Sequence, residues 1–233
     1  MALADELKTE VKRIFATRWD ERDGRVVPEP KDVSLDNQAV KFDRATVLYA
    51  DLRGSTSLVD GMTYSFAAEV YRTYLYCAAR LIRGEGGVIT AYDGDRVMGL
   101  FIGDLQSTSA ARCALKINDA VANIINPALK AQYQSASYQV QHVIGIDTSA
   151  LHAARIGVRG GNDLVWVGRA ANYAAKLANL NGNRITWITE AVFGKLSKEA
   201  KFSNPGDKLM WDECKWQDMG GITIYGSNWR WTV

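Results

Sequence analysis

The sequence predicts a mixed α/β (α+β) fold, a ferredoxin-like βαββαβ core with additional strands and helices. Two observations carry this prediction. From Ala45 onward the hydrophobic pattern alternates between a period of two and a period near 3.6, in the order strand, helix, strand, strand, helix, strand. The second and third strands are joined by Asp93-Gly94, a strong signal for a two-residue hairpin. With 233 residues, 47% of them hydrophobic, the chain can bury a large core.

The first part of the chain reads as an appendage to that core. A short amphipathic helix is predicted from apolar residues at helical spacing, namely Leu3, Leu7, Val11, Ile14 and Phe15. A polar stretch that contains Pro28 and Pro30 follows and reads as a linker. We therefore expect an N-terminal helix and linker over residues 1–42 and one domain over residues 43–233.

The first half of the domain shows the clearest elements. "ATVLYADL" is a buried strand that ends in an aspartate, and "SFAAEVYRTYLYCAARLIR" is a helix that stops at Gly84. Its apolar face consists of Phe66, Val70, Tyr74, Ala78 and Leu81. "VITAY" and "RVMGLFI" are the hairpin strands. A two-residue turn at Asp93-Gly94 pairs residue 92 with 95 and residue 91 with 96.

The second half continues with a helix, "SAARCALKINDAVANII", which should end before Pro127. A long alternating strand, "SYQVQHVIGIDT", comes next, then a strand "LVWV", a helix "RAANYAAKLANL" and a β-rich tail. This order favours a sheet with an antiparallel centre and with helices on one face.

Composition excludes several functional classes. The net charge is only +2, from 28 basic and 26 acidic residues, so binding of nucleic acid through phosphates is not favoured. Three cysteines without a C-x-x-C pair, and two histidines, argue against a disulfide framework or a zinc site and favour a reducing, cytoplasmic location. We expect no direct membrane insertion, because no run of about 18 apolar residues occurs.

Two aspartates are the best candidates for chemistry. Asp51 lies where a strand runs into a Gly-Ser-Thr turn, and capping or turn formation is an equally good explanation of it alone. Asp95 follows the hairpin, where acids are depleted within strands. The first and third strands of such a sheet are commonly neighbours, which would bring Asp51 beside Asp95. Adjacent carboxylates repel unless a cation lies between them, so the pair predicts a Mg²⁺ or Mn²⁺ site for phosphoryl transfer.

Two weaker signals accompany this pair. Gly54, Ser55 and Thr56 could offer backbone N–H groups to a phosphate. Asn172 and Lys176 are four residues apart on one predicted helix, and an amide beside a cation suits the charge that develops on a transferring phosphoryl group. An ordinary exposed helix face would explain the latter two residues as well.

Together these segments resemble the class III nucleotidyl cyclase family over about residues 45–180. "VLYADLRGST" and "DGDRVM" resemble its two metal-binding motifs, which makes Asp51, Leu52 and Asp95 the candidate metal ligands for two ions per site. "VIGIDTSALHAARIG" resembles its Gly-Ile-His-x-Gly segment, from which Asp147 and Ser149 depart. "VWVGRAANYAAKL" resembles its Gly-x-x-x-Asn-x-x-x-Arg segment, in which Asn172 and Lys176 take the transition-state roles.

This resemblance implies a head-to-tail homodimer in which the metal aspartates of one subunit face Asn172 and Lys176 of the other. It also implies in-line attack of a 3′-hydroxyl on the α-phosphate, with release of pyrophosphate. Lys176 keeps the charge of the family's Arg but lacks its bidentate fork. A domain that only binds a nucleotide or a partner, without catalysis, is the alternative from another functional class.

The base-reading positions of the family point to a pyrimidine. Ala91 and Val165 stand where purine cyclases place polar residues, and neither can form a side-chain hydrogen bond to a base. Tyr49 stands two residues before Asp51, and Arg96, placed opposite Ala91 by the expected register, could fill the space that Ala91 leaves. The chain is thus most similar to the pyrimidine cyclases of bacterial Pycsar anti-phage defence, whose product acts on a separate effector protein. Arg donors favour UTP over CTP, and an adenylate cyclase with atypical base contacts is a further alternative.

Overall fold

The computed structural model describes residues 2–204 and 206–233, and these fall into two compact units. One comprises Met1–Asp43 and Ala150–Gly168, and the other comprises Arg44–Ser149 and Arg169–Val233. Two long strands, β2 (Gln38–Leu52) and β5 (His142–Val158), contribute residues to both units. The larger unit holds every candidate site residue except Val165.

The larger unit has the expected βαββαβ order. Its first elements are the end of β2, α2 (Ser55–Gly61), α3 (Tyr64–Gly84), β3 (Val88–Asp93), β4 (Arg96–Phe101), α4 (Gln106–Ala120) and the start of β5. The additions that follow are α6 (Arg169–Ala178), β7 (Thr186–Thr189), α7 (Glu190–Phe193), α8 (Lys198–Lys201), β8 (Asp212–Trp216), η3 (Gln217–Met219) and β9 (Ile222–Ser227). The ferredoxin-like prediction and the β-rich tail are thus confirmed.

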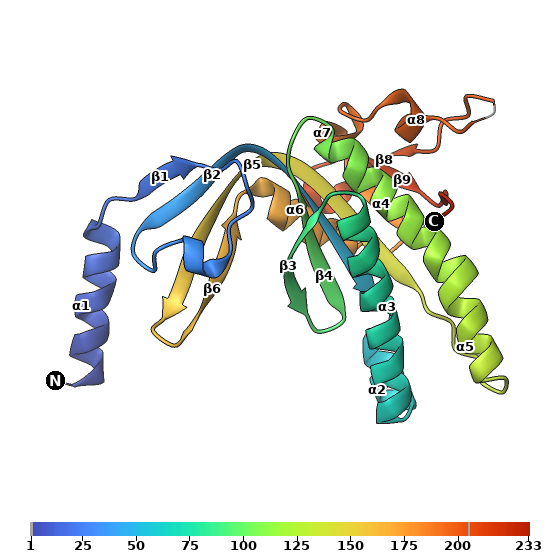
Figure 1. Cartoon of the computed structure of the whole chain (residues 1–233), viewed down its shortest axis with the longest axis horizontal. Coiled ribbons are helices and arrows are strands. Elements are labelled where there is room, and N and C mark those ends of the chain that lie inside the picture. Colours follow the sequence, from blue (N-terminus) through green and yellow to red (C-terminus); the bar gives the residue numbers. More distant parts are fainter. Residues whose placement is uncertain (1, 205) are drawn as a thin grey trace. The chain divides into compact units, whose positions relative to one another are not determined.

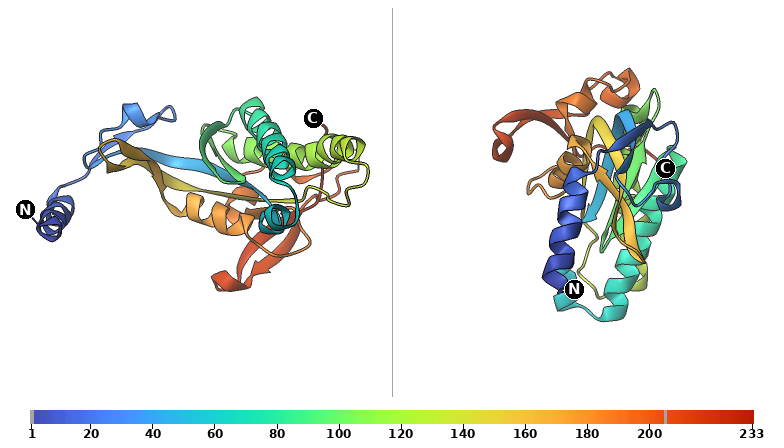
Figure 2. Two further views of the ribbon diagram at one scale, coloured as in Figure 1. Left: turned by 90° about the horizontal axis from the view of Figure 1, so that it is seen from below. Right: turned by 90° about the vertical axis from the view of Figure 1, so that its left-hand side faces the viewer.

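The sheet of this unit has the strand order β3-β4-β2-β5-β7-β9-β8. Helices α3 and α4 cover one face, and their apolar side chains form the main core with alternate residues of β2, such as Leu48 and Ala50. Helix α6 lies on the other face (Figures 1 and 2), so the expectation of helices on one face only is wrong for this element. A second cluster, which includes Val143, Leu177 and Trp187, forms there.

Close packing of α6 against β5 depends on Gly145. A Cβ atom at this position would lie 2.1 Å from the backbone oxygen of Ala174 and 2.5 Å from the backbone nitrogen of Ala178. The small side chains of α6 and the bare backbone of β5 therefore allow the helix to approach the sheet closely. This contact fixes the depth at which α6 lies on the sheet.

Helix α3 follows its sequence pattern with one change. Thr63 caps its start by accepting a hydrogen bond from the backbone N–H of Phe66, at 3.4 Å. The row of buried side chains continues from Ala78 to Ile82, whereas Leu81 is only partly buried. The spacing of four residues that runs from Phe66 to Ala78 is thus kept for one more step, which leaves the buried side chains on one side of the helix.

Two predicted boundaries are wrong. Pro127 does not end the second helix, because η2 (Val121–Ile125), a π-helical turn, leads directly into α5 (Asn126–Gln132) with Pro127 in its first turn. Proline is tolerated there because the first N–H groups of a helical segment have no partner. Strand β5 starts at His142 rather than Ser137 and runs on to Val158, where it forms a hairpin with β6 (Gly161–Val167).

The hairpin of β3 and β4 also differs from the expected register. Its turn residues are Gly94, with φ of 61°, and Asp95, while Asp93 ends β3 and pairs with Arg96. Ala91 pairs with Met98 instead of Arg96, because the turn lies one residue later than expected, and the ladder shifts only beyond Ala91, between Ala91 and Ile89. Asp95 is therefore a turn residue. The depletion of acidic residues within strands does not apply to it and is no evidence for a functional role.

The smaller unit consists of α1 (Leu3–Ala16), β1 (Asp20–Asp23), η1 (Pro30–Asp32), the start of β2, the end of β5 and β6. The predicted amphipathic helix is confirmed, and the apolar side chains on it are exposed. The expected linker contains a short strand, β1, which pairs in parallel with β2.

Candidate active site

Asp51 and Asp95 reach the same end of the sheet from different elements. Asp51 is the penultimate residue of β2 and pairs across the ladder with Arg96, the first residue of β4. Asp95 precedes Arg96 in the turn. The expected juxtaposition of the two aspartates is present, since Asp95 is next to the cross-strand partner of Asp51, and its charge helps to raise the pKa of Asp51.

The surroundings of this pair disfavour negative charge. Burial, and after it the charge of Asp95, raise the pKa of Asp51 to about 6. The Oδ2 atom of Asp95 is buried and has no hydrogen-bond partner. The hydroxyls of Tyr74 and Tyr138 are likewise buried without a partner. Burial, and also the charge of Asp95, raises the pKa of both tyrosines. Unpaired buried oxygens are costly and call for a bound water or ion.

A divalent cation fits the oxygens at this position. Mg²⁺ and Mn²⁺ prefer carboxylate oxygens, and Mg²⁺ is commonly held by one or two carboxylates together with substrate phosphates. Among the described residues no three His, Cys, Asp or Glu side chains gather into a cluster that could hold a metal alone. The Leu52 side chain is buried in the core, which leaves only its backbone carbonyl as a possible ligand. The remaining ligands would have to come from the substrate.

A row of side chains leads away from the two aspartates on the sheet face opposite α3 and α4. Tyr49 pairs across the ladder with Met98, and Met98 pairs with Ala91. Because β4 lies between β3 and β2, Met98 lies between Ala91 and Tyr49. Met98 is buried, whereas Ala91 is exposed. No side chain in this row except Tyr49 carries a hydrogen-bonding group.

Arg96 covers part of this row. Its guanidinium donates a 2.6 Å hydrogen bond from Nη2 to Oδ2 of Asp93 and lies 5.7 Å from the centre of the Tyr49 ring. Arg96 therefore approaches Tyr49 from the ladder position that pairs with Asp51, and not from a position opposite Ala91. The expected placement of Arg96 opposite Ala91 is wrong, and its guanidinium lies over the Tyr49 ring instead.

The other predicted substrate contacts lie at exposed positions. Gly54 has φ of 72° and precedes the seven-residue helix α2, in which Ser55 is half-buried and Thr56 is exposed. Val165 belongs to the smaller unit, where it pairs with Ala154 and has a 43% exposed side chain. A role in binding stays a prediction for all four residues.

Asn172 and Lys176 share the exposed side of α6, as their spacing predicts. The buried side of this helix consists of small and apolar residues that include Ala170, Ala174 and Leu177. The Nζ atom of Lys176 lies 3.5 Å from the sulfur of Met219, which is a weak partner for a cation. Both side chains are thus available to another molecule.

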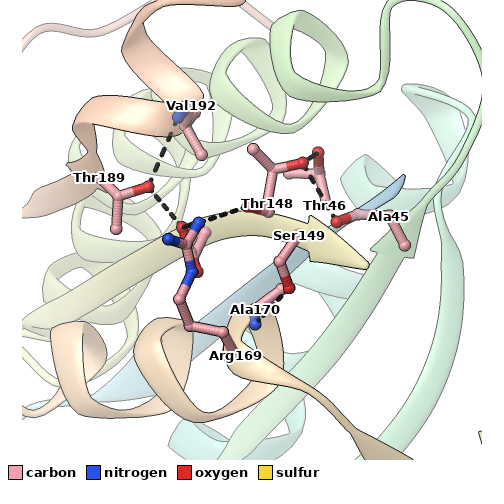
Figure 3. Close-up of polar contacts among 9 residues, drawn as sticks. Ala45, Thr46, Thr148, Ser149, Arg169, Ala170, Thr189 and Val192 are labelled. Carbon is pink, nitrogen blue, oxygen red and sulfur yellow. Dashed lines mark hydrogen bonds and ion pairs between the residues drawn. The ribbon is translucent and has the colours of Figure 1, made fainter. Parts of the chain in front are cut away.

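One polar network beside α6 was missed by the sequence reasoning (Figure 3). Asp147, a noted departure from the family motif, is fully buried and pairs with Arg169 at 3.1 Å and 3.3 Å. Thr189 donates a 2.5 Å hydrogen bond to the same carboxylate. The signal that could have revealed it is an acid in the middle of the apolar strand "VIGIDT", which requires a buried cation or donor.

Helices of the described segments, residues 2–204 and 206–233, all lack the combination of length and apolar composition that crossing a bilayer requires. No protein-family model matches the chain.

Curated relatives match over the full length. The chain is 53% identical to the uridylate cyclase of Xanthomonas perforans and 53% identical to that of Burkholderia cepacia, and each alignment covers all of both chains. It is 36% identical to the uridylate cyclase of Rhodovulum sp. (strain MB263), over 99% of this chain and 98% of the relative.

Solved structures share the fold. The guanylyl cyclase Cya2 aligns with a TM-score of 0.65 at 19% identity, over 80% of this chain and 92% of that structure. The adenylyl cyclase CyaB from P. aeruginosa aligns with a TM-score of 0.63 at 20% identity, over 81% of this chain and 95% of that one. The chain therefore belongs to the family of uridylate cyclases and has the fold of class III nucleotide cyclase catalytic domains.

Proposed function

We propose that the protein is a uridylate cyclase that converts UTP into 3′,5′-cyclic UMP and pyrophosphate. The observation that carries the reaction is a pair of neighbouring, partly buried aspartates, Asp51 and Asp95, of which Asp95 has a buried carboxylate oxygen without a partner. The relatives that are 53% identical over their full length support UTP as the substrate.

The chemistry is an in-line displacement. The 3′-hydroxyl oxygen of the nucleotide forms a bond to the α-phosphorus and gives its proton to water, while the bond from the α-phosphorus to the oxygen that bridges to the β-phosphate breaks and pyrophosphate leaves. Asp51, Asp95 and the carbonyl of Leu52 would hold two Mn²⁺ or Mg²⁺ ions, which would neutralise phosphate charge and activate the attacking oxygen. Gly54, Ser55 and Thr56 would contact the triphosphate.

We assign stabilisation of the transition state to α6. Asn172 would donate from its amide and Lys176 from its ammonium group to the oxygens on which charge develops. The exposure of both side chains supports a head-to-tail homodimer, in which Asn172 of the partner subunit completes the site of the first subunit. Two composite sites follow from the symmetry of such a dimer.

A pyrimidine base fits the candidate base-reading residues. Ala91 and Val165 offer no side-chain hydrogen bond, and a site without such groups cannot select a purine through its polar edge. Tyr49 and Arg96 offer a flat aromatic surface and a cationic donor instead, and carbonyl oxygens of uracil are suitable acceptors for that donor. We further propose that the cyclic nucleotide acts on a separate effector protein in the cytoplasm during anti-phage defence.

A turnover assay with UTP, CTP, ATP and GTP in the presence of Mn²⁺ tests the substrate. We expect cyclic UMP as the dominant product. Cyclic CMP is the product of the alternative substrate, CTP, and is measured beside it. Formation of cyclic AMP without cyclic UMP would contradict the proposal. If the folded protein binds UTP but converts none of the four nucleotides, the domain only binds nucleotide.

Subunit mixing tests the composite site. An Asp51→Ala homodimer and an Asn172→Ala homodimer should each be inactive, whereas a mixture that exchanges subunits should recover about a quarter of the wild-type activity, because half of the dimers then hold one intact site. A site made within one subunit predicts no recovery.

A further inference from the structure

An ion pair between the buried Asp147 and the half-exposed Arg169 holds the start of α6 against β5. Asp147 is 0% exposed, and its Oδ2 and Oδ1 atoms accept hydrogen bonds from Nε and Nη2 of Arg169, the first residue of α6. Arg169 Nη2 also donates to the backbone oxygen of Thr148, at 2.8 Å. The fork of one guanidinium thus binds two consecutive residues of the strand, which fixes its direction as well as its distance.

Two further contacts complete the attachment. Ser149 accepts a 2.9 Å hydrogen bond on Oγ from the backbone N–H of Ala170, the second residue of α6. Thr189, at the end of β7, donates its hydroxyl to Asp147 and accepts from the backbone N–H of Val192 in α7. Figure 3 shows these partners converging from the strand, from α6 and from α7. The Asp147 carboxylate therefore connects three elements of the larger unit.

This attachment lies next to the residues to which we assign catalysis. Asn172 is three residues and Lys176 seven residues after Arg169, which is about one and two helical turns. A helix moves nearly as a rigid body, so a rotation or a shift at Arg169 displaces Asn172 and Lys176 as well. Their counterpart groups lie on another molecule, the substrate, so a small displacement changes how well they meet it.

We propose that Asp147 is a positioning residue of the reaction, which acts through Arg169 to set the orientation of α6 and thereby of Asn172 and Lys176. This inference rests on the proposed function, because it requires that these two residues meet the nucleotide. Asp147 has no exposed surface, so it would act on the reaction through Arg169.

Docking of α6 does not require the ion pair. Ala174 and Ala178 already pack directly against Gly145, and Leu177 is fully buried in the second cluster. Apolar packing is non-directional, whereas a paired carboxylate and guanidinium have one preferred geometry. The helix should therefore remain on the sheet without Asp147 but lose its exact orientation.

Replacement of Asp147 by Asn tests the orientation. We expect kcat for cyclic UMP formation to fall about 10- to 100-fold with KM for UTP changed less than about twofold, since misplacement of a catalytic group by 1 Å can cost as much. Arg169→Lys keeps the charge and loses the fork, so an intermediate loss is expected. Should Asp147→Asn fail to fold, Arg169→Lys and Thr189→Val provide the same measurement.

Glu85 supplies a matched control. It is another buried carboxylate with two ion pairs, to Arg112 at 2.5 Å and to Lys116 at 2.8 Å, but it lies between α3 and α4 on the opposite face of the sheet. Glu85→Gln should lower the melting temperature without changing kcat of the folded enzyme. Equal losses of kcat in Glu85→Gln and Asp147→Asn would overturn the proposal, because burial of a carboxylate alone would then explain both.

A double-variant comparison separates positioning from general damage. In a background of Asn172→Ala with Lys176→Ala, Asp147→Asn should cause almost no further loss of kcat, because the groups that it orients are already absent. An additive loss would overturn the proposal. If Asn172→Ala by itself leaves kcat unchanged, the catalytic role of α6 is wrong; if it lowers kcat while Asp147→Asn does not, only the positioning role is wrong.

Discussion

The partly buried carboxylates of Asp51 and Asp95 and the fully buried carboxylate of Asp147 have opposite surroundings in this fold. At the end of β2, Asp51 and Asp95 lie close together, and the Oδ2 atom of Asp95 has no partner. In the middle of β5, Asp147 has Arg169 and Thr189 around it. A buried acid whose oxygens are all paired belongs to the framework, whereas one left unpaired is available for a cation that the protein does not itself supply.

The difference extends to the neighbours of each group. Around Asp95 the hydroxyls of Tyr74 and Tyr138 are also buried without a partner. Next to Asp147 the hydroxyls of Thr46 and Thr148 bond to each other at 3.0 Å, and Thr148 also bonds to the backbone oxygen of Ala45. Unsatisfied groups thus gather at the proposed metal site, where free energy of folding is given up for binding.

The largest expected effect separates the two groups by activity. Asp95→Asn should lower turnover by about 10³-fold or more, because metal-assisted charge stabilisation is worth several kcal/mol. Mn²⁺ should raise the melting temperature of the wild type but not of this variant, as measured by calorimetry. Asp104→Asn, in the exposed loop after β4, is the control and should behave as the wild type. A variant that still responds to Mn²⁺ would show that the metal is bound elsewhere.

The next effect concerns α6. Asn172→Ala should lower kcat by about 10²-fold, as the loss of one preorganised donor to a developing charge does, with little change in KM. Steady-state kinetics with UTP measure both constants. The exposed Asn179 lies one turn beyond Lys176, outside the family motif, and Asn179→Ala should leave kcat unchanged. An equal effect of the two substitutions would remove Asn172 from the site.

Stability should change in opposite directions at the two carboxylate groups. Without metal, Asp51→Asn should raise the free energy of unfolding by about 1 kcal/mol, because it removes repulsion between two carboxylates and the cost of burying one of them. Burial also raises the pKa of Asp147, but Asp147→Asn should lower the free energy of unfolding by about 1–3 kcal/mol, because Arg169 and Thr189 lose a charged partner. Urea unfolding in the presence of a chelator measures both. The same sign at both sites would break the contrast.

A smaller effect is expected at Lys176. Lys176→Arg restores the bidentate fork that the resemblance associates with this position, and kcat should rise by about two- to fivefold if the transferring phosphate is the partner. A fall in kcat would mean that the site is shaped around the narrower ammonium group. Lys176→Met, of similar length but uncharged, separates the contribution of charge from that of packing.

A separate effect, on stability alone, is a pH dependence that arises from His142. Burial lowers the pKa of His142 to about 3, and its Nε2 donates a 2.8 Å hydrogen bond to Asn118. As the pH falls, His142 takes up a proton near pH 6.5 in the unfolded chain but only near pH 3 in the folded chain. Its contribution to the free energy of unfolding is therefore fully present above pH 6.5 and is lost as the pH falls to 3. The slope should approach 1.36 kcal/mol per pH unit, and His142→Gln should reduce it by that amount. Unfolding measured at several pH values checks this, and an unchanged slope would contradict it.

Local sequence determined most of the fold. Periodicity identified the βαββαβ order and the amphipathic helix α1, because these patterns report which side of an element is buried. The sequence rules failed at Pro127, where a π-helical turn leads into a further helix with the proline in its first turn, and at the hairpin, where the turn is Gly94-Asp95. The first failure concerns a helix boundary and the second a strand register, and neither is decided by local preference alone.

The sequence by itself determined that Asp51 ends one strand, that Asp95 lies at the hairpin before a neighbouring strand, and that Asn172 and Lys176 share a helix side, because strand order and helical spacing are properties of the chain. Only the tertiary structure decided which acids have partners. Asp147 stands in an apolar strand, and its partners Arg169 and Thr189 come from segments 22 and 42 residues away. The partners of a buried charge are chosen by long-range packing, and for that reason a motif can locate an acid but cannot reveal whether its oxygens are free.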